Sequence, residues 1–179
     1  MAHNLNYNEQ TGKYSFFSVQ EKAWHGLGQI VADYPCSAEA IRFAGLDYTV
    51  EKRPLRTLDN AGGAAIDVPG FFSTLRTDTE QVLGIVGGNY QVIQNVDAFT
   101  FFDSIVEDEG MLYETAGALG RGERVFITAK LPDYIRVGRD DLIEKYLFLT
   151  TSHDGSGSIM AAFTPVRIVC NNSATRWMN

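Results

Sequence analysis

Residues 95–110, NVDAFTFFDSIVEDEG, are the stretch that best defines the fold of this chain. Its apolar residues recur at spacings of three and four, which places them on one face of a helix: Val96, Phe99, Phe102 and Val106. Asn95 is a residue type that favours the N-terminal cap, and Gly110 favours a stop. The stretch predicts a helix over 95–109 whose apolar face packs on a sheet formed by the strands before it.

The sequence before this helix predicts a short helix and then three strands. Residues 37–44 fit a helix, since the Ser37 hydroxyl can cap its first turn and Gly45 can end it. Apolar residues then alternate with polar ones, as in a strand with one buried face: Leu46, Tyr48 and Val50. Pro54 lacks a backbone donor, so that strand lies at a sheet edge or contains a bulge. Further strands are predicted at 71–77 and 81–86.

The sequence after the helix predicts β-hairpins. The expected pairs of strands are 112–115 with 124–131, and 146–151 with 159–169. The second pair turns at residues 153–157, which contain Asp154-Gly155, a dipeptide that favours hairpin turns. Together the elements predict an α+β fold, in which two helices cover one face of a twisted antiparallel sheet of about six strands. We expect it to consist of a β-β-β-α core with added β-hairpins.

Length and composition fit one globular domain. The chain has 179 residues, of which 45% are hydrophobic and 21% charged, so it can bury a sizeable core and is not disordered throughout. Residues 1–22 lack a clear period and are interpreted as an N-terminal arm, and residues 23–179 as a single α+β domain. Asn172 has the character of a helix cap close to the end of the chain. We therefore expect a helical C-terminal region to be missing from this sequence.

The net charge, the cysteines and the lack of long apolar runs indicate the type of partner and the cellular compartment. The net charge of −7 opposes binding to nucleic acid unless a local basic cluster overcomes it. The sequence contains no apolar run of about 18 residues and no secretory signal at its start, so we expect a cytoplasmic protein without membrane contact. Cys36 and Cys170 fit no metal or redox spacing, and both are expected to be reduced.

Several stretches carry a resemblance when they are taken in order: Ala23–Gly28, Gly88–Asn95, Tyr113–Gly117, and Leu149–Ser156 with Phe163–Asn172. They resemble the phage/plasmid-like protein family, a domain of unknown function found on mobile elements. The resemblance implies an origin on a mobile element of a bacterial host, a longer chain with a helical C-terminal half, and no settled activity. The motif residues, all of unknown role, are Trp24, His25, Gly26, Gly28, Asn89, Tyr90, His153, Asp154, Gly155, Arg167 and Asn171.

The order of elements carries a more distant resemblance. Helix 37–44, three strands between residues 46 and 93, and helix 95–109 give the order α-β-β-β-α. This order is similar to the core of the single-strand annealing proteins that phages use for recombination. The similarity implies binding of single-stranded DNA, and it transfers no motif residues.

Catalytic chemistry is not indicated. Ser152, His153 and Asp154 are adjacent, whereas the members of a catalytic triad converge from separate elements. We expect His153 to be exposed beside the hairpin turn. The histidines and cysteines are too scattered for a metal site, and no glycine loop completes a phosphate-binding pattern, so no metal or cofactor is expected.

Basic residues on the first strands are the remaining candidates for a site. Lys52, Arg53, Arg56 and Arg76 form the expected cluster, and Tyr90 is near enough to stack on a base. We therefore expect a non-enzymatic protein that binds single-stranded DNA in recombination or replication. The alternative, favoured by the acidic charge, is a protein-interaction module acting on a host factor, and an uncharacterised enzyme is the third interpretation. Self-association is compatible with each.

Overall fold

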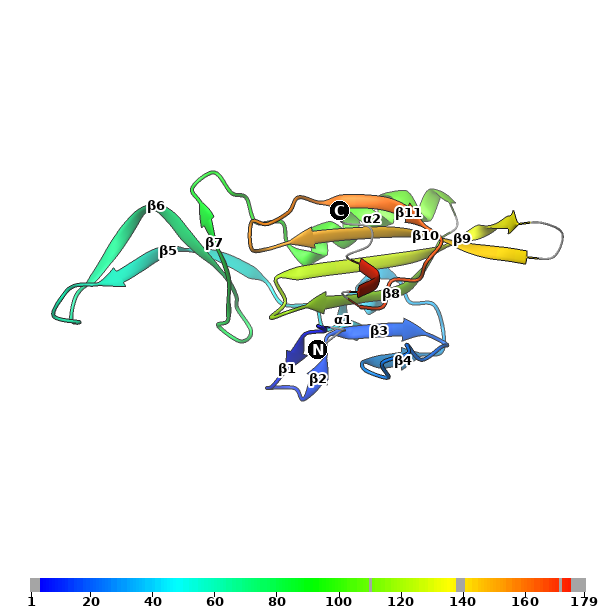
Figure 1. The fold of residues 1–179 in the computed structure, drawn as a ribbon, viewed down its shortest axis with the longest axis horizontal. Helices are drawn as coiled ribbons and strands as arrows, with labels where there is room; N and C mark the ends of the chain where they lie inside the picture. The colour runs from blue at the N-terminus through cyan, green and yellow to red at the C-terminus, as the bar shows by residue number, and fades with distance from the viewer. Residues whose placement is uncertain (1–3, 110, 138–140, 171, 175–179) are drawn as a thin grey trace.

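The structure, a computed structural model, describes residues 4–109, 111–137, 141–170 and 172–174. This part of the chain contains eleven strands and the helices α1 (Ser37–Phe43) and α2 (Asn95–Glu109). The elements form a body and a separate sheet that projects from one end of it (Figure 1).

The body is built on a six-stranded sheet with the order β11-β10-β9-β8-β3-β4. Neighbouring strands are antiparallel except β3 and β4, which are parallel. The bounds are β3 (Phe16–Val19), β4 (Gln29–Val31), β8 (Leu112–Leu119), β9 (Arg124–Val137), β10 (Asp141–Ser152) and β11 (Met160–Thr164). The α+β class and the sheet of about six strands are therefore confirmed, and the parallel pair makes the sheet mixed.

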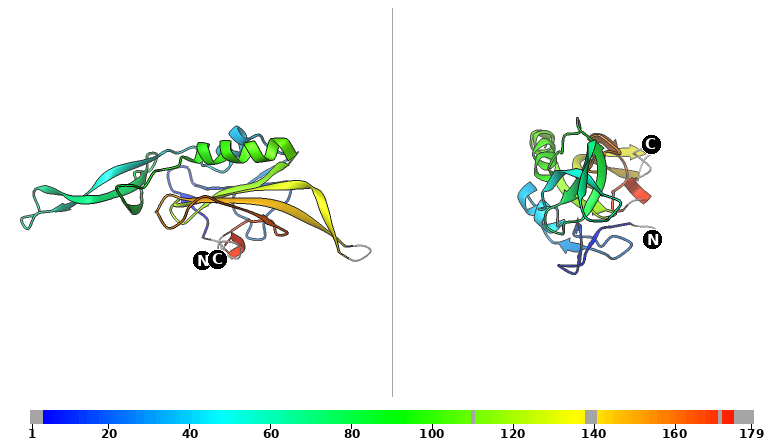
Figure 2. Two further views of the ribbon diagram at one scale, coloured as in Figure 1. Left: turned by 90° about the horizontal axis from the view of Figure 1, so that it is seen from above. Right: turned by 90° about the vertical axis from the view of Figure 1, so that its left-hand side faces the viewer.

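Both helices lie on one face of this sheet, as the left view of Figure 2 shows. α1 contacts β3 and β8, α2 contacts β9, and the two helices contact each other. The core between the layers includes Phe99 of α2, whose ring stacks on that of Tyr113 in β8 with centroids 5.7 Å apart. The expectation of two helices on one face is confirmed.

The apolar face of α2 is centred on Phe99 and Phe102, which are both buried. Val96 is exposed, and the side chain of Val106 lies outside the described part of the structure. The strand that α2 contacts is β9, which follows the helix in sequence. The expectation that α2 packs on the strands before it was wrong, because those strands form the projecting sheet.

The local sequence correctly predicts some of the helix ends and not others. At the start of α1 the cap is Cys36 and not Ser37, and the Cys36 N–H donates to the Glu39 carboxylate at 3.0 Å. Gly45 ends this helix with a φ of +61°, and the N–H groups of Gly45 and Leu46 bond back to its last turn. Here the sequence-based prediction of the stop is confirmed.

Asn95 does not cap α2, although its residue type favours that role. Its amide nitrogen donates to the carbonyl oxygen of Leu46 at 3.0 Å, and its oxygen accepts from His153. The first turn is closed instead by the carbonyl of Gln94, which accepts from Asp97 and Ala98. A buried tertiary contact has replaced the local one.

The projecting sheet consists of β5 (Val50–Leu58), β6 (Ala65–Arg76) and β7 (Val82–Gly87), which are antiparallel in that order. Figures 1 and 2 show that it extends well beyond the body. β5 is an edge strand, and its register shifts between Pro54 and Arg56, as the proline predicts. The expected element order β-β-β-α is present, but its strands are not part of the sheet under α2.

The first residues of the chain belong to the body. β1 (Tyr7–Asn8) pairs with β2 (Lys13–Tyr14), and β3 lies inside the six-stranded sheet with Phe16 and Phe17 fully buried. Residues 16–19, interpreted from the sequence as part of an N-terminal arm, thus form an interior strand. A strand of four residues is too short to show a period of its own.

Cys36 and Cys170 are unbridged, as expected from their spacing, and only Cys170 is buried. No helical segment in the described residues combines the length and the apolar character that crossing a bilayer requires.

We predict that Phe102→Ala lowers the free energy of unfolding by about 3–5 kcal/mol, because the fully buried ring leaves a cavity between α2 and the sheet. Phe101→Ala is the matched control, since the neighbouring ring is 48% exposed, and it should cost about 0.5 kcal/mol or less. Urea unfolding measures both. Equal losses in the two variants would contradict the layered arrangement.

Candidate functional site: the projecting sheet and its junction with the body

Arg53 and Arg56, two of the residues expected to contact DNA, form ion pairs on the surface of the projecting sheet. Arg53 pairs with Glu51 and with Glu80, each at 2.8 Å, and Arg56 pairs with Asp67 at 2.7 Å. All five side chains are about half exposed or more, so the pairs contribute little to stability. Their main effect is on the electric field, because they cancel the positive charge of the sheet.

Lys52, Arg76 and Tyr90 are turned toward other parts of the protein. The Lys52 ammonium donates to the carbonyl oxygen of Tyr90 at 2.9 Å and lies 4.7 Å from the centre of the Phe72 ring. Arg76 is only 1% exposed. The Tyr90 hydroxyl donates to the carbonyl oxygen of Ser152 at 2.8 Å. The structure thus divides the expected basic cluster between surface ion pairs and structural contacts.

Arg76 is the centre of a buried polar junction between the projecting sheet and the body. Its guanidinium makes two hydrogen bonds to Asp78, at 2.9 and 2.7 Å, and a third to Asn6 at 2.9 Å. Its central carbon lies 3.8 Å from the centre of the Tyr48 ring. The Tyr48 hydroxyl donates to the carbonyl oxygen of Gly122 at 2.8 Å, and burial raises its pKa to about 12. Tyr48 is therefore a neutral donor at pH 7.

His153 belongs to the same junction and is fully buried, so the expectation that it is exposed was wrong. Its Nε2 donates to the Asn95 side-chain oxygen at 2.9 Å, and its carbonyl oxygen accepts from the Thr74 hydroxyl at 2.6 Å. Its ring meets that of Tyr48 edge-on at 6.4 Å. Nδ1 has no hydrogen-bond partner within the described ranges. Burial lowers the His153 pKa to about 4, and the nearby Asp154 carboxylate only partly opposes this effect.

The turn after His153 packs directly against β7. Asp154 accepts a hydrogen bond from the Ser156 N–H at 2.8 Å, and Gly155 has a φ of +77°, as this turn type requires. Gly84 comes so close that a Cβ added there would lie 2.5 Å from the Cα of Asp154. The sequence predicts the turn, but it does not predict that the projecting sheet packs against it. The burial of His153 was missed for this reason.

A second group of motif residues holds the C-terminal loop against the face of the main sheet opposite the helices (Figure 2). The His25 Nε2 donates to the carbonyl oxygen of Val169 at 3.0 Å. Gly26 and Gly28 have φ values of +69° and +83°, which glycine adopts without strain. Trp24 is 68% exposed and meets the His25 ring edge-on. This motif therefore positions a loop.

Arg167 fixes the same loop to the sheet. Its Nε lies 3.1 Å from the Glu114 carboxylate, and its Nη2 donates to the carbonyl oxygens of Val19 and Glu21, each at 3.2 Å. Burial raises the pKa of Glu114, while the charges of Arg167 and Lys130 act in the opposite direction. Loss of either partner would leave the other charge buried without a counter-charge. The role of Arg167 in this fold is therefore structural.

The sequence analysis missed an exposed apolar face on the projecting sheet. Phe71, Val82 and Ile85 are 51%, 45% and 58% exposed. The register places Ile85 opposite Ser73, and Phe71 lies two residues before Ser73 on β6, so these side chains share one face. We call the face of Phe71, Val82 and Ile85 the outer face. The signal in the sequence was the apolar residues at 71–77 and 81–86, which we predicted to belong to the sheet under the second helix.

The fold and these contacts define an α+β domain with a projecting sheet. Residues 82–176, slightly more than half of the chain, match the family described as Domain of unknown function (DUF932). The chain belongs to this family. No curated protein and no solved structure matches it. The matched region includes Asn89, which is exposed, and Asn171, which lies outside the described residues.

We predict that the stability of the protein falls as the pH is lowered from 6.5 toward 4, because the unfolded chain protonates His153 in this window and the folded chain does not. The loss attributable to this residue is roughly 3 kcal/mol. Urea unfolding of the wild-type protein and of His153→Gln at several pH values separates the contribution of His153 from that of the other titrating groups. Parallel pH profiles of the two proteins would contradict the burial of a neutral His153.

Proposed function

We propose that the protein is an interaction module that binds a protein partner through the outer face of its projecting sheet. The observation that supports this most directly is the exposure of Phe71, Val82 and Ile85 on one face, next to cations whose charge is already compensated. Clustered exposed apolar side chains are typical of contact surfaces. Compensated cations give such a surface little attraction for a polyanion.

The charged residues around the outer face suit a protein contact. Arg53 is paired in register with Ser73, so it lies on the same face, and its ion pairs with Glu51 and Glu80 border the apolar centre. An apolar centre with a charged rim is the usual anatomy of a non-obligate interface. The rim favours specificity and the rate of association more than affinity.

The edge of the sheet formed by β5 is less suited to binding than its face. The ladder between β5 and β6 shifts register between Pro54 and Arg56, and Pro54 has no N–H to offer a partner strand. Addition of a foreign strand along β5 is therefore interrupted at its middle. The partner contacts the side chains of the outer face.

The proposal includes an origin on a mobile element, which rests on the order of the motifs that resemble the phage/plasmid-like family. The partner is then a host protein, and the place of action is the cytoplasm of a bacterial host. The acidic net charge of −7 fits a protein that avoids nucleic acid in that setting.

We predict that the double variant Phe71→Glu/Ile85→Glu binds its protein partner about 100-fold more weakly, because two charges enter the apolar centre of the contact. Wild-type and variant proteins, immobilised in parallel, are used to capture partners from a bacterial lysate, and a captured protein is then titrated against each. Leu142→Glu, at a residue that is 54% exposed on β10, is the matched control. A partner that binds the double variant and the wild type equally would refute the outer face as the contact.

Single-stranded DNA binding, with a role in recombination or replication, is the second candidate. It is favoured by Lys52, which lies over the Phe72 ring beside the partly exposed Tyr90, since aromatic and basic groups together suit a splayed strand. Arg53 and Arg56 could exchange their exposed carboxylate partners for phosphates at low cost.

For this candidate we predict a salt slope of about −2 in log K against log salt with a short oligothymidylate, because three cations of the sheet remain accessible. Four were expected from the sequence, but Arg76 is buried. Arg53→Glu/Arg56→Glu should abolish binding, as measured by fluorescence anisotropy. If wild-type protein does not bind at about 20 mM salt, where screening is weak, the candidate fails.

A further inference from the structure

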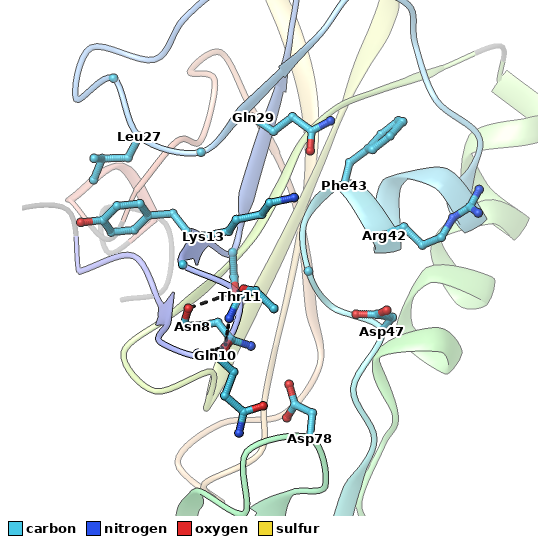
Figure 3. A pocket seen from close by; sticks show the side chains of 16 residues that line it. Asn8, Gln10, Thr11, Lys13, Leu27, Gln29, Arg42, Phe43, Asp47 and Asp78 are labelled. Carbon is cyan, nitrogen blue, oxygen red and sulfur yellow. Dashed lines mark hydrogen bonds between the residues drawn. The ribbon is translucent and has the colours of Figure 1, made fainter.

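A cleft of about 970 Å³ lies on the body between the β1–β2 hairpin, the turn of the Gly26–Gln29 segment and the end of α1. Figure 3 shows its side chains. Its volume is at the upper end of the usual range for small-molecule sites, roughly 300–1,000 Å³. Its charged lining residues are Lys13, Arg42, Asp47 and Asp78.

The cleft carries uncompensated positive charge on an otherwise acidic protein. Asp78 is neutralised by its two hydrogen bonds to Arg76. Lys13 and Arg42 form no ion pair with any described residue. Two cations, Lys13 and Arg42, thus line a cleft in which only Asp47 is an uncompensated anion.

An aromatic side chain and an amide side chain complete the lining of the cleft. Phe43 is partly buried: its ring packs edge-on against Phe17 of the core at 6.2 Å, and it also borders the cleft. Figure 3 shows Lys13 extending from β2 across the cleft toward Gln29 and Phe43. Gln29 is exposed and carries both a donor and an acceptor. A ligand in this cleft can meet a cation, an aromatic ring and an amide together.

We propose that this cleft binds a nucleotide, that is, a phosphate ester next to a planar heterocycle. The phosphate lies at Lys13, with Arg42 adding to the attraction. The base lies against Phe43, and the Gln29 amide contacts its edge. Asp47 accepts from a sugar hydroxyl and opposes a second anionic group. The nucleotide is either free or one unit of a single strand, and no residue of β5, β6 or β7 lines the cleft.

The test is a calorimetric titration of the whole chain at about 20 mM salt with five ligands. They are dAMP, deoxyadenosine, inorganic phosphate, a short oligothymidylate, and dTMP as the reference for the oligothymidylate. We expect dAMP to bind at least tenfold more tightly than deoxyadenosine or phosphate. Lys13→Gln should weaken dAMP binding about tenfold or more. Arg136→Gln removes the same charge from an exposed position on β9 and should change it less than twofold.

The outcomes separate the sources of the ligand. Tighter binding of the oligothymidylate than of dTMP, reduced by Lys13→Gln, supports a strand as the source, and equal binding supports a free nucleotide. The proposal is overturned if no probe binds, if phosphate binds as tightly as dAMP, or if Lys13→Gln has no effect. Arg53→Glu/Arg56→Glu should leave dAMP binding unchanged, so failure of this site and failure of DNA binding by the projecting sheet are distinguishable.

Discussion

The burial of the Arg76 guanidinium is the constraint on which the attachment of the projecting sheet depends. A charge that is 1% exposed is tolerated only when it is fully paired, and here one partner is close in sequence and the others come from distant parts of the chain. They are Asp78 after β6, Asn6 before β1 and the ring of Tyr48 before β5. Gly122 completes the enclosure, since a Cβ there would lie 2.8 Å from Arg76 Nη1. Separation of Arg76 from any of these groups would expose the guanidinium to solvent or leave it buried without a partner.

Structural features that depend on one or a few neighbouring residues could be predicted from the sequence. Features that depend on how distant segments pack together could not. The stop at Gly45, the irregularity at Pro54 and the turn at Asp154-Gly155 each depend on the backbone preference of one residue type, and all three are present. The placement of β5–β7 in a separate sheet depends on which surfaces meet. A short strand with apolar residues has the same sequence character whether it lies in the core sheet or packs on the junction.

The candidate site was predicted less well than the fold, for a related reason. The sequence identifies Arg76 and His153 as polar residues near strand ends, and such residues are usually exposed. Which face they occupy follows from register, and register sets Arg76 opposite Val50 on the face that meets the body. Lys13 was overlooked because the first 22 residues were interpreted as an arm, although they form one wall of the cleft.

The junction also connects the two proposed binding surfaces. Asp78 lines the cleft and at the same time neutralises Arg76, which holds the projecting sheet in place. Asp78 lies two residues after Arg76, so displacement of the projecting sheet by a partner would move this pair together and break the hydrogen bond from Arg76 to Asn6. The cleft would then lose the wall that Asp78 forms, and by reciprocity a ligand bound in the cleft would favour the docked sheet. The two sites would thus be negatively coupled if partner binding moves the sheet, and independent if the partner binds the outer face without moving it.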